Sequence, residues 1–275
     1  MTTAQPDLPP LRLTIIGGGR MGEALLGGLL AAGWAPPADL GVVEPDPQRR
    51  QTLAERYPGV RVTDTVGPSE GAVLAVKPGY ATEVCAGLGD LGVARVLSIA
   101  AGVTTSRLEE AIGAPMAVVR SMPNTPAQVG AGASAVAAGS HATEDDLVWA
   151  ESVLGSVGVT VRVPEDLLDA VTGLSGSGPA YVFLMVEALI DAGVAQGLPR
   201  EVAGALVVQT VAGAAEILNR TGASGTDAAE HREAVTSPQG TTAAGLAVLD
   251  GRDLRGIVAE AVAAATARSR QLGAS

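Results

Sequence analysis

The pattern of apolar residues changes near residue 165, and this change constrains the fold more than any other feature. Short apolar runs alternate with helical segments up to that point, and only glycine-bounded helical segments follow. Strands that alternate with helices are typical of a mostly parallel sheet covered on both faces. We therefore expect an α/β domain over residues 11–164 and an all-α domain over residues 165–275, after a flexible tail at residues 1–10.

The predicted elements follow from hydrophobic periodicity and from glycine and proline breaks. The predicted strands are 11–16, 40–44, 60–62, 72–76, 95–99, 116–120 and 159–163, with helices at 23–32 and 47–56. The predicted helices of the second domain are 165–173, 179–192, 199–218, 228–235, 241–250 and 253–271. The helix at 199–218 is apolar nearly all round and is expected to be buried. We expect a second copy of the chain to cover it, which predicts a homo-oligomer.

The composition excludes several classes of protein. The net charge is −11, which argues against a nucleic-acid surface. The single cysteine, Cys85, rules out an intrachain disulfide, and the two histidines stand far apart, so no metal site is expected. The N-terminus has no signal-peptide pattern, and the most apolar helices carry acidic residues. We expect a cytoplasmic protein without a transmembrane segment.

A glycine motif follows the first predicted strand. Gly17, Gly19 and Gly22 form G-x-G-x-x-G at the head of the first predicted helix. In a dinucleotide-binding fold these glycines allow a tight turn, approach of a pyrophosphate and close packing of helix on strand. The alternative is a glycine turn with a structural role only. The agreement of strand, turn and helix favours the dinucleotide site.

The charged residues near the motif leave the choice between NADH and NADPH open. Glu44 ends the second predicted strand, where an acid usually binds the ribose hydroxyls of NAD and repels the phosphate of NADP. Arg49 and Arg50 follow and can pair with that phosphate, or can be solvated helix residues. Lys77, the only lysine, follows the fourth strand and is either a cofactor contact or a surface residue. The sequence does not decide between NADH and NADPH.

The segment 235–250 is suited to holding a small carboxylate. Ser237-Pro-Gln-Gly240 is a turn that begins a helix, and Thr241 and Thr242 open that helix. A helix start offers free N–H groups to an anion, and a threonine hydroxyl can bond a small polar atom. The alternative is that both threonines only cap the helix. No strong acid or base lies in the segment.

Several motifs together resemble the pyrroline-5-carboxylate reductase family over residues 11–272. The motifs are Gly-Gly-Gly-Arg-Met-Gly at 17–22, Ala-Val-Lys-Pro at 75–78, Arg-Ser-Met-Pro-Asn-Thr-Pro at 120–126, Leu-Ser-Gly-Ser-Gly-Pro-Ala-Tyr at 174–181 and the segment 236–250. The resemblance implies an NAD(P)H-dependent reduction of L-1-pyrroline-5-carboxylate to L-proline. It also implies a Rossmann-like domain followed by a dimerisation domain, a site where domains and subunits meet, and further assembly, such as a decamer.

The site residues expected on these grounds form two groups. Cofactor contacts are expected from Gly17, Gly18, Gly19, Arg20, Met21, Gly22, Glu44, Ala75, Val76, Lys77, Pro78, Ala100, Met122, Pro123 and Asn124. Substrate contacts are expected from Ser177 and from the N–H groups of Gly240, Thr241 and Thr242. The Thr242 hydroxyl is the candidate catalytic group, with a hydrogen bond to the ring nitrogen. Gln239 stands where the family usually has glycine, so a positive φ there would be strained.

Two rival functions differ from this one in the residues they need. A β-hydroxyacid dehydrogenase shares the two-domain plan but carries a lysine general acid, and Val182 occupies the corresponding position. Carbonyl reduction needs a proton donor for the emerging alkoxide, so this substitution favours imine chemistry. A nucleotide-sensing regulator would bind the dinucleotide but has no need of the Thr-Thr segment.

Overall fold

The computed structural model describes residues 9–221 and 225–274, so most of the expected tail at residues 1–10 lies outside it. Contacts divide the chain into two compact units. The first contains the chain up to Ser177 together with the last turns of the C-terminal helix from Ala263, and the second spans Gly178–Val262. The change from strands to helices comes earlier, after Arg162. The last helix therefore belongs to both units, a feature absent from the predicted division at 164/165.

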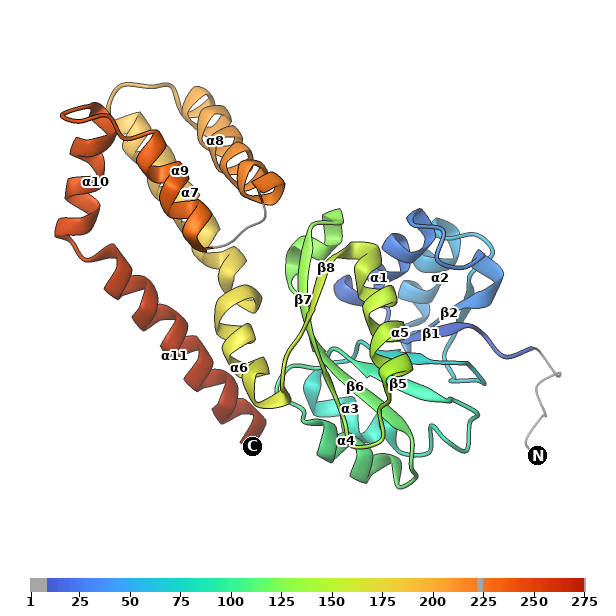
Figure 1. Ribbon diagram of the computed structural model, residues 1–275. Coiled ribbons are helices and arrows are strands. Elements are labelled where there is room, and N and C mark those ends of the chain that lie inside the picture. The colour runs from blue at the N-terminus through green and yellow to red at the C-terminus, as the bar shows by residue number, and fades with distance from the viewer. Residues whose placement is uncertain (1–8, 222–224, 275) are drawn as a thin grey trace. The chain divides into compact units, whose positions relative to one another are not determined.

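The first unit is built on an eight-stranded sheet (Figure 1). Its strands are β1 (Leu13–Ile16), β2 (Leu40–Val43), β3 (Arg61–Thr63), β4 (Ala72–Leu74), β5 (Arg95–Ser98), β6 (Ala117–Met122), β7 (Gly132–Ala138) and β8 (Gly158–Arg162). The order is β3-β2-β1-β4-β5-β6-β7-β8, and every neighbouring pair is parallel except β6 and β7. The first six strands have the order of a Rossmann dinucleotide-binding sheet. The predicted mostly parallel sheet is confirmed.

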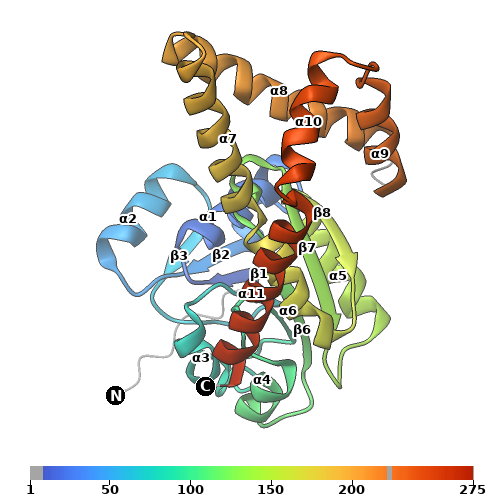
Figure 2. The ribbon, with the colours of Figure 1, turned by 90° about the vertical axis from the view of Figure 1, so that its left-hand side faces the viewer.

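Helices cover both faces of the sheet, as the figures show for α1 and α2 and for α3 and α4 (Figures 1 and 2). They are α1 (Arg20–Ala31), α2 (Pro47–Arg56), α3 (Ala81–Cys85), α4 (Thr105–Ile112), α5 (Glu144–Leu154) and α6 (Leu168–Val171). Successive residues of one strand enter different cores: Ile15 packs with α1, α2 and α5, whereas Ile16 packs with α3 and α4. This period of two explains why the parallel strands read as continuous apolar runs.

The sequence prediction missed four elements and simplified a fifth. It did not include α3, α4, α5 or the antiparallel strand β7. The predicted helix 165–173 is α6 followed by a π-helical stretch over Thr172–Gly176. A π-helical turn adds a residue to the helix and is often found at functional sites.

The second unit is helical and has almost no core of its own. It contains α7 (Gly178–Ala195), α8 (Arg200–Thr221), α9 (Gly225–Ala234), α10 (Thr241–Gly251) and the first part of α11 (Leu254–Ala274). Among its described residues only Ala203 is buried. Phe183 and Leu184 on α7 and Leu206 and Val208 on α8 are 56–66% exposed. One chain leaves α8 exposed, so the expected burial of this helix requires the second copy of the chain.

By length and composition alone, two helical segments could span a membrane. They are Glu165–Ala195 and Arg200–Thr221, and almost none of their apolar stretches is buried. The sequence expectation was that no helix makes a clean transmembrane span, because the most apolar helices carry acidic residues. An apolar protein interface and a membrane span have the same length and composition by this criterion.

Candidate active site

The glycine loop lies between β1 and β4, where the order of the strands reverses. Gly17 has φ +110°, and a Cβ there would stand 2.6 Å from the carbonyl oxygen of Ala75. A Cβ on Gly22 would overlap the carbonyl oxygen of Gly17. Both glycines are therefore required by the packing of loop, helix and strand, whether or not a ligand is present. Ligands of open α/β sheets bind at such a reversal, outside the carboxyl ends of the strands.

Gly19 differs from its neighbours, because nothing within the protein requires a glycine there. A Cβ on Gly19 would meet no atom within 4 Å, and its backbone is extended, with φ −69°. It is the N-cap of α1 and provides no side-chain cap. In the described chain, no acceptor is found for the N–H groups of Gly19, Arg20, Met21 and Gly22. An open, uncapped helix start fits a pyrophosphate, so this cradle fits the predicted dinucleotide.

Glu44 and the two arginines after it are bound to the protein itself. The Glu44 carboxylate accepts the N–H of Gly18 at 2.9 Å and that of Asp46 at 3.0 Å. Arg49 donates to the Gly18 carbonyl oxygen at 2.7 Å and pairs with Glu23 on α1. Arg50 donates to the carbonyl oxygen of Glu44 at 2.8 Å. Neither arginine is simply solvated: Arg49 bonds to the glycine loop, and Arg50 bonds to the turn after β2.

A pocket of about 280 Å³ joins six of the predicted cofactor residues. Its lining combines Met21 with residues that follow β4, β5 and β6. The six are Met21, Ala75, Val76, Met122, Pro123 and Asn124, and Ile99, Thr125 and Gly176 complete the lining. The last three were not predicted, although Ile99 ends a predicted strand and Gly176 lies in the motif at 174–181. Small and apolar residues at strand ends suit a flat nicotinamide ring.

Asn124 fixes one wall of this pocket. Its side-chain amide donates to the carbonyl oxygen of Ser175 at 3.0 Å and accepts the N–H of Ala133 at 2.9 Å. The residue is 9% exposed. A Cβ on Gly176 would stand 2.7 Å from the terminal methyl of Met122. The π-helical stretch thus packs directly on the loop after β6, and Asn124 holds the two together.

The other predicted cofactor residues lie beside this pocket rather than in it. Lys77 and Pro78 are exposed and begin the loop after β4. Ala100 is 2% exposed and belongs to the core, although Ile99 and Ala101 on either side line pockets. Ser177 lies next to Gly176 and lines a neighbouring pocket. The cofactor contacts of Lys77, Pro78 and Ala100 and the substrate contact of Ser177 stay predictions.

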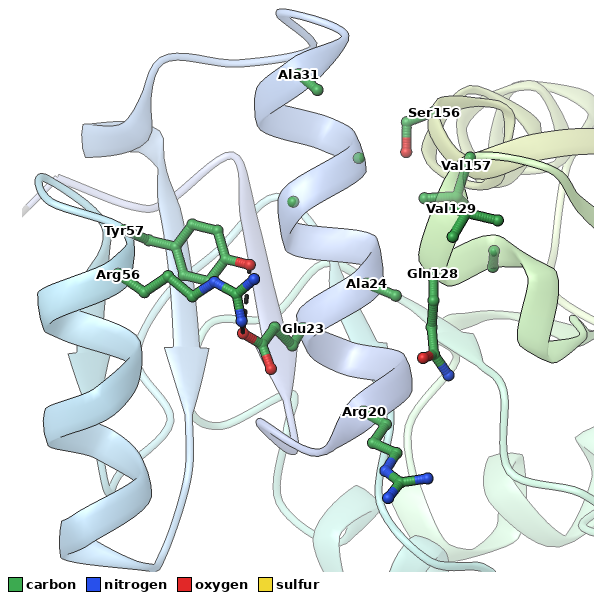
Figure 3. A pocket seen from close by; sticks show the side chains of 14 residues that line it. Arg20, Glu23, Ala24, Ala31, Arg56, Tyr57, Gln128, Val129, Ser156 and Val157 are labelled. Atoms are coloured by element: carbon green, nitrogen blue, oxygen red, sulfur yellow. Dashed lines mark hydrogen bonds and ion pairs between the residues drawn. The ribbon is translucent and has the colours of Figure 1, made fainter. Parts of the chain in front are cut away.

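A separate pocket of about 470 Å³ opens on the outer side of α1 (Figure 3). Glu23 points there toward Arg56 and Tyr57, with an ion pair to Arg56 at 2.8 Å. Burial raises the pKa of Glu23, but Arg49 and Arg56 outweigh it and the net pKa is lowered. Arg20 is the one predicted cofactor residue in this lining. Glu23, Arg56 and Tyr57 are paired with one another, so we assign no reaction to this pocket.

The start of α10 in the helical unit has the geometry of an anion site, with one correction. The N–H of Gly240 donates to the Ser237 carbonyl oxygen at 3.0 Å, so it is not the free donor that the sequence suggested. In the described chain the N–H groups of Thr241, Thr242 and Ala243 have no acceptor, and neither threonine caps the helix. A Cβ on Gly240 would overlap the Ser237 hydroxyl. Gly240 therefore shapes the turn that exposes the next three N–H groups.

Gln239 adopts a left-handed conformation. Its φ is +61°, one of two positive values among the described non-glycine residues. A side chain in this region costs about 1 kcal/mol relative to glycine. The departure from the family pattern noted at this position therefore has a structural cost.

These features define a class of protein: an NAD(P)-dependent oxidoreductase with a Rossmann domain and a helical domain. Residues 12–102 match the family described as "NADP oxidoreductase coenzyme F420-dependent". Residues 165–272 match "Pyrroline-5-carboxylate reductase dimerisation".

Individual relatives narrow this class to one family. A pyrroline-5-carboxylate reductase of Synechocystis is 46% identical, covering 96% of this chain and 98% of its own. The solved reductase of Coxiella burnetii is 37% identical with a TM-score of 0.88, covering 95% and 98% of the two chains. That of Plasmodium falciparum, solved with NADP bound, is 30% identical with a TM-score of 0.80, covering 96% and 98%. The chain belongs to the pyrroline-5-carboxylate reductase family.

Membership of the family accounts for the exposed apolar surface of the helical unit. The match to the dimerisation family covers α7, α8 and α10, whose apolar side chains are exposed in one chain. An interface between copies buries such a surface by the hydrophobic effect. A homo-oligomer therefore explains the two long apolar helices without a membrane.

Proposed function

We propose that the chain reduces L-1-pyrroline-5-carboxylate to L-proline with NADPH, and with NADH as a second donor. The observation that carries the proposal is the start of α10, where three free N–H groups stand beside two hydroxyls and no acid. This arrangement binds a carboxylate but supplies no strong proton donor.

The substrate carboxylate is held by the N–H groups of Thr241, Thr242 and Ala243. The partial positive charge of the helix start favours an anion there. Thr242 is half-buried, and its hydroxyl accepts a hydrogen bond from the N–H of the protonated ring nitrogen, which keeps the imine carbon in one orientation. Thr241 is exposed and contributes its N–H.

The reaction needs orientation more than acid catalysis. A protonated imine already carries the positive charge that draws a hydride, and the amine product needs no further proton from the protein. Val182, in place of a lysine, is consistent with this chemistry. Holding the imine carbon close to the donor supplies the larger part of the rate by proximity.

The cofactor is held by the glycine loop and the pocket after β6. Bound NADPH supplies the hydride. The free N–H groups of Gly19, Arg20 and Met21 bind the pyrophosphate, and Met122 and Pro123 bound the nicotinamide site. The Glu44 carboxylate is already shared by two backbone N–H groups, which weakens its preference for NAD. A relative solved with NADP also supports NADPH.

We propose a homodimer through α7, α8 and α10, which can assemble further into a decamer. A cytoplasmic location follows from the biosynthetic reaction and remains a prediction.

Thr242→Ala tests the role of the hydroxyl. Loss of one hydrogen bond to a charged group should lower kcat about tenfold or more, with the Kd for NADPH unchanged. Thr242→Ser keeps a hydroxyl and should restore most of the activity. Unchanged kinetics for Thr242→Ala would contradict the assignment. If the wild-type chain binds NADPH but does not oxidise it with this substrate, the nucleotide-sensing function is favoured instead.

A further inference from the structure

A second pocket of the first unit lies against the C-terminal helix, and its lining includes Pro78 and Ser177, two of the expected cofactor and substrate contacts. Its volume is about 660 Å³. It is bounded by the loops after β4 and β5, by α4, by the π-helical stretch and by the last turns of α11. Its polar lining includes Arg107, Arg268, Thr82 and Ser177.

The wall formed by α11 is fixed to the first unit. The Ser269 hydroxyl donates to the Asp169 carboxylate at 2.6 Å, and Ser269 is 6% exposed. Gly102 has φ +76°, and a Cβ on Gly273 would stand 2.8 Å from its carbonyl oxygen. Arg107 donates to the carbonyl oxygen of Gly273 at 3.4 Å. The last turn of α11 therefore holds Arg268 at the pocket by specific contacts.

The charge of this pocket is the reverse of that of the chain. Two guanidinium groups line it and no carboxylate does, although the net charge of the chain is −11. In the described residues, nine arginines form ion pairs with carboxylates, and Arg107 and Arg268 are not among them. Two unneutralised guanidinium groups facing one cavity favour an anionic ligand.

The pocket adjoins the one assigned to the nicotinamide. The two linings alternate along the same three segments: Val76 and Pro78, Ile99 and Ala101, and Gly176 and Ser177. A ligand in the second pocket would therefore contact the loops that shape the first.

We propose that this pocket binds a small anionic ligand, held by Arg107 and Arg268, beside the hydride-transfer site. The ligand carries phosphate or carboxylate groups, which guanidinium groups bind through charged hydrogen bonds. It is distinct from the substrate carboxylate, which we place at the start of α10. The site does not depend on the proposed reaction.

Calorimetric titration of the full chain tests the site, with inorganic phosphate and citrate as probes at constant ionic strength. The chain is first saturated with NADP⁺, so that the protein groups that bind the phosphates of the cofactor are occupied. The wild type should bind at least one probe. Phosphate alone would assign a phosphorylated ligand, and citrate alone a carboxylate ligand. The double variant Arg107→Gln/Arg268→Gln should bind about tenfold more weakly or worse.

Two further variants make the result specific. Arg270→Gln removes a neighbouring charge outside the lining and should bind as the wild type does. Arg268→Gln alone serves if the double variant does not fold, because Arg268 makes its one described hydrogen bond to Gln271. Equal binding in the wild type and in the Arg268 variants would overturn the proposal. The same holds if Arg270→Gln weakens binding as much as Arg268→Gln does. A wild type that binds neither probe at millimolar concentration would also overturn it.

Discussion

The carbonyl oxygen of Ala75 lies 2.6 Å from the position that a Cβ on Gly17 would take. The backbone after β1 therefore passes very close to the backbone after β4, at the point where the strand order reverses. Gly19, two residues on, has open space around it and an ordinary backbone conformation. The same motif therefore contains one glycine that the fold requires, Gly17, and one, Gly19, whose missing side chain leaves space only a ligand would use.

Alanine should affect stability at Gly17 and cofactor binding at Gly19. Gly17→Ala should lower the free energy of unfolding by about 1–3 kcal/mol, because it combines a positive φ with a steric overlap. Gly19→Ala should change stability by less than about 0.5 kcal/mol, as for a surface residue. It should instead raise the KM for NADPH about tenfold, by obstructing the pyrophosphate. Urea denaturation and steady-state kinetics of both variants check this, and an unaltered KM for Gly19→Ala would contradict the assigned cradle.

Replacing Gln239 with glycine should stabilise the chain. Gln239 has φ +61°, and glycine adopts that conformation without steric cost. The free energy of unfolding should rise by about 1 kcal/mol, measured by urea denaturation. Asp253 is a matched comparison: it also has a positive φ, but its carboxylate accepts the N–H of Gly256 at 3.2 Å. Asp253→Gly should gain less, and a loss of stability in Gln239→Gly would refute the strain argument.

The ion pair of Glu165 should make the chain sensitive to acid. Its carboxylate accepts the N–H of Thr105 at 2.8 Å and pairs with the buried Arg120 at 3.0 Å. Burial raises the pKa of Glu165, but the bonds from Thr105 and Arg120 outweigh it, so the net pKa lies below the ordinary value of 4.5. A lowered folded pKa gives stability that is complete above the unfolded value and is lost as the pH falls through the folded one.

Glu165→Gln should remove this dependence. At neutral pH it should cost about 3 kcal/mol, because the charge of buried Arg120 is left uncompensated. Below pH 4.5 the difference from the wild type should shrink as the wild-type carboxylate becomes protonated. Denaturation at a series of pH values measures both effects, with the exposed Glu201→Gln as control. A constant difference between wild type and Glu165→Gln over that range would contradict the account.

The sequence predicted the parallel strands well, because apolar runs buried on both faces leave a strong pattern. It missed β7, whose sequence Gly-Ala-Ser-Ala-Val-Ala-Ala has few residues with high strand propensity. It missed α3, which is five residues long and too short to show helical periodicity. It also missed α5, although Trp149 of that helix fills the space that a Cβ on Gly71 would need.

The sequence grouped six residues that line one pocket, but it missed hydrogen bonds across long separations in the chain. The roles of these residues in binding stay predictions. The ends of β4, β5 and β6 meet at one pocket, as the rule for open sheets requires. The sequence could not show that the N–H of Gly18 donates a hydrogen bond to the Glu44 carboxylate. Nor could it show that the Asn124 side chain donates to the carbonyl oxygen of Ser175. These pairs depend on how distant segments fold together, which no local pattern records.

Transfer of deuterium from the cofactor tests the central claim most directly. The full chain is incubated with L-1-pyrroline-5-carboxylate and NADPH that carries deuterium at the transferring position of the nicotinamide, and the product is analysed by mass spectrometry and NMR. Hydride transfer to the imine carbon predicts proline one mass unit heavier, with the deuterium on the ring carbon that is bonded to nitrogen and does not carry the carboxylate. Unlabelled proline, or no proline while the cofactor is bound, would contradict the assigned reaction.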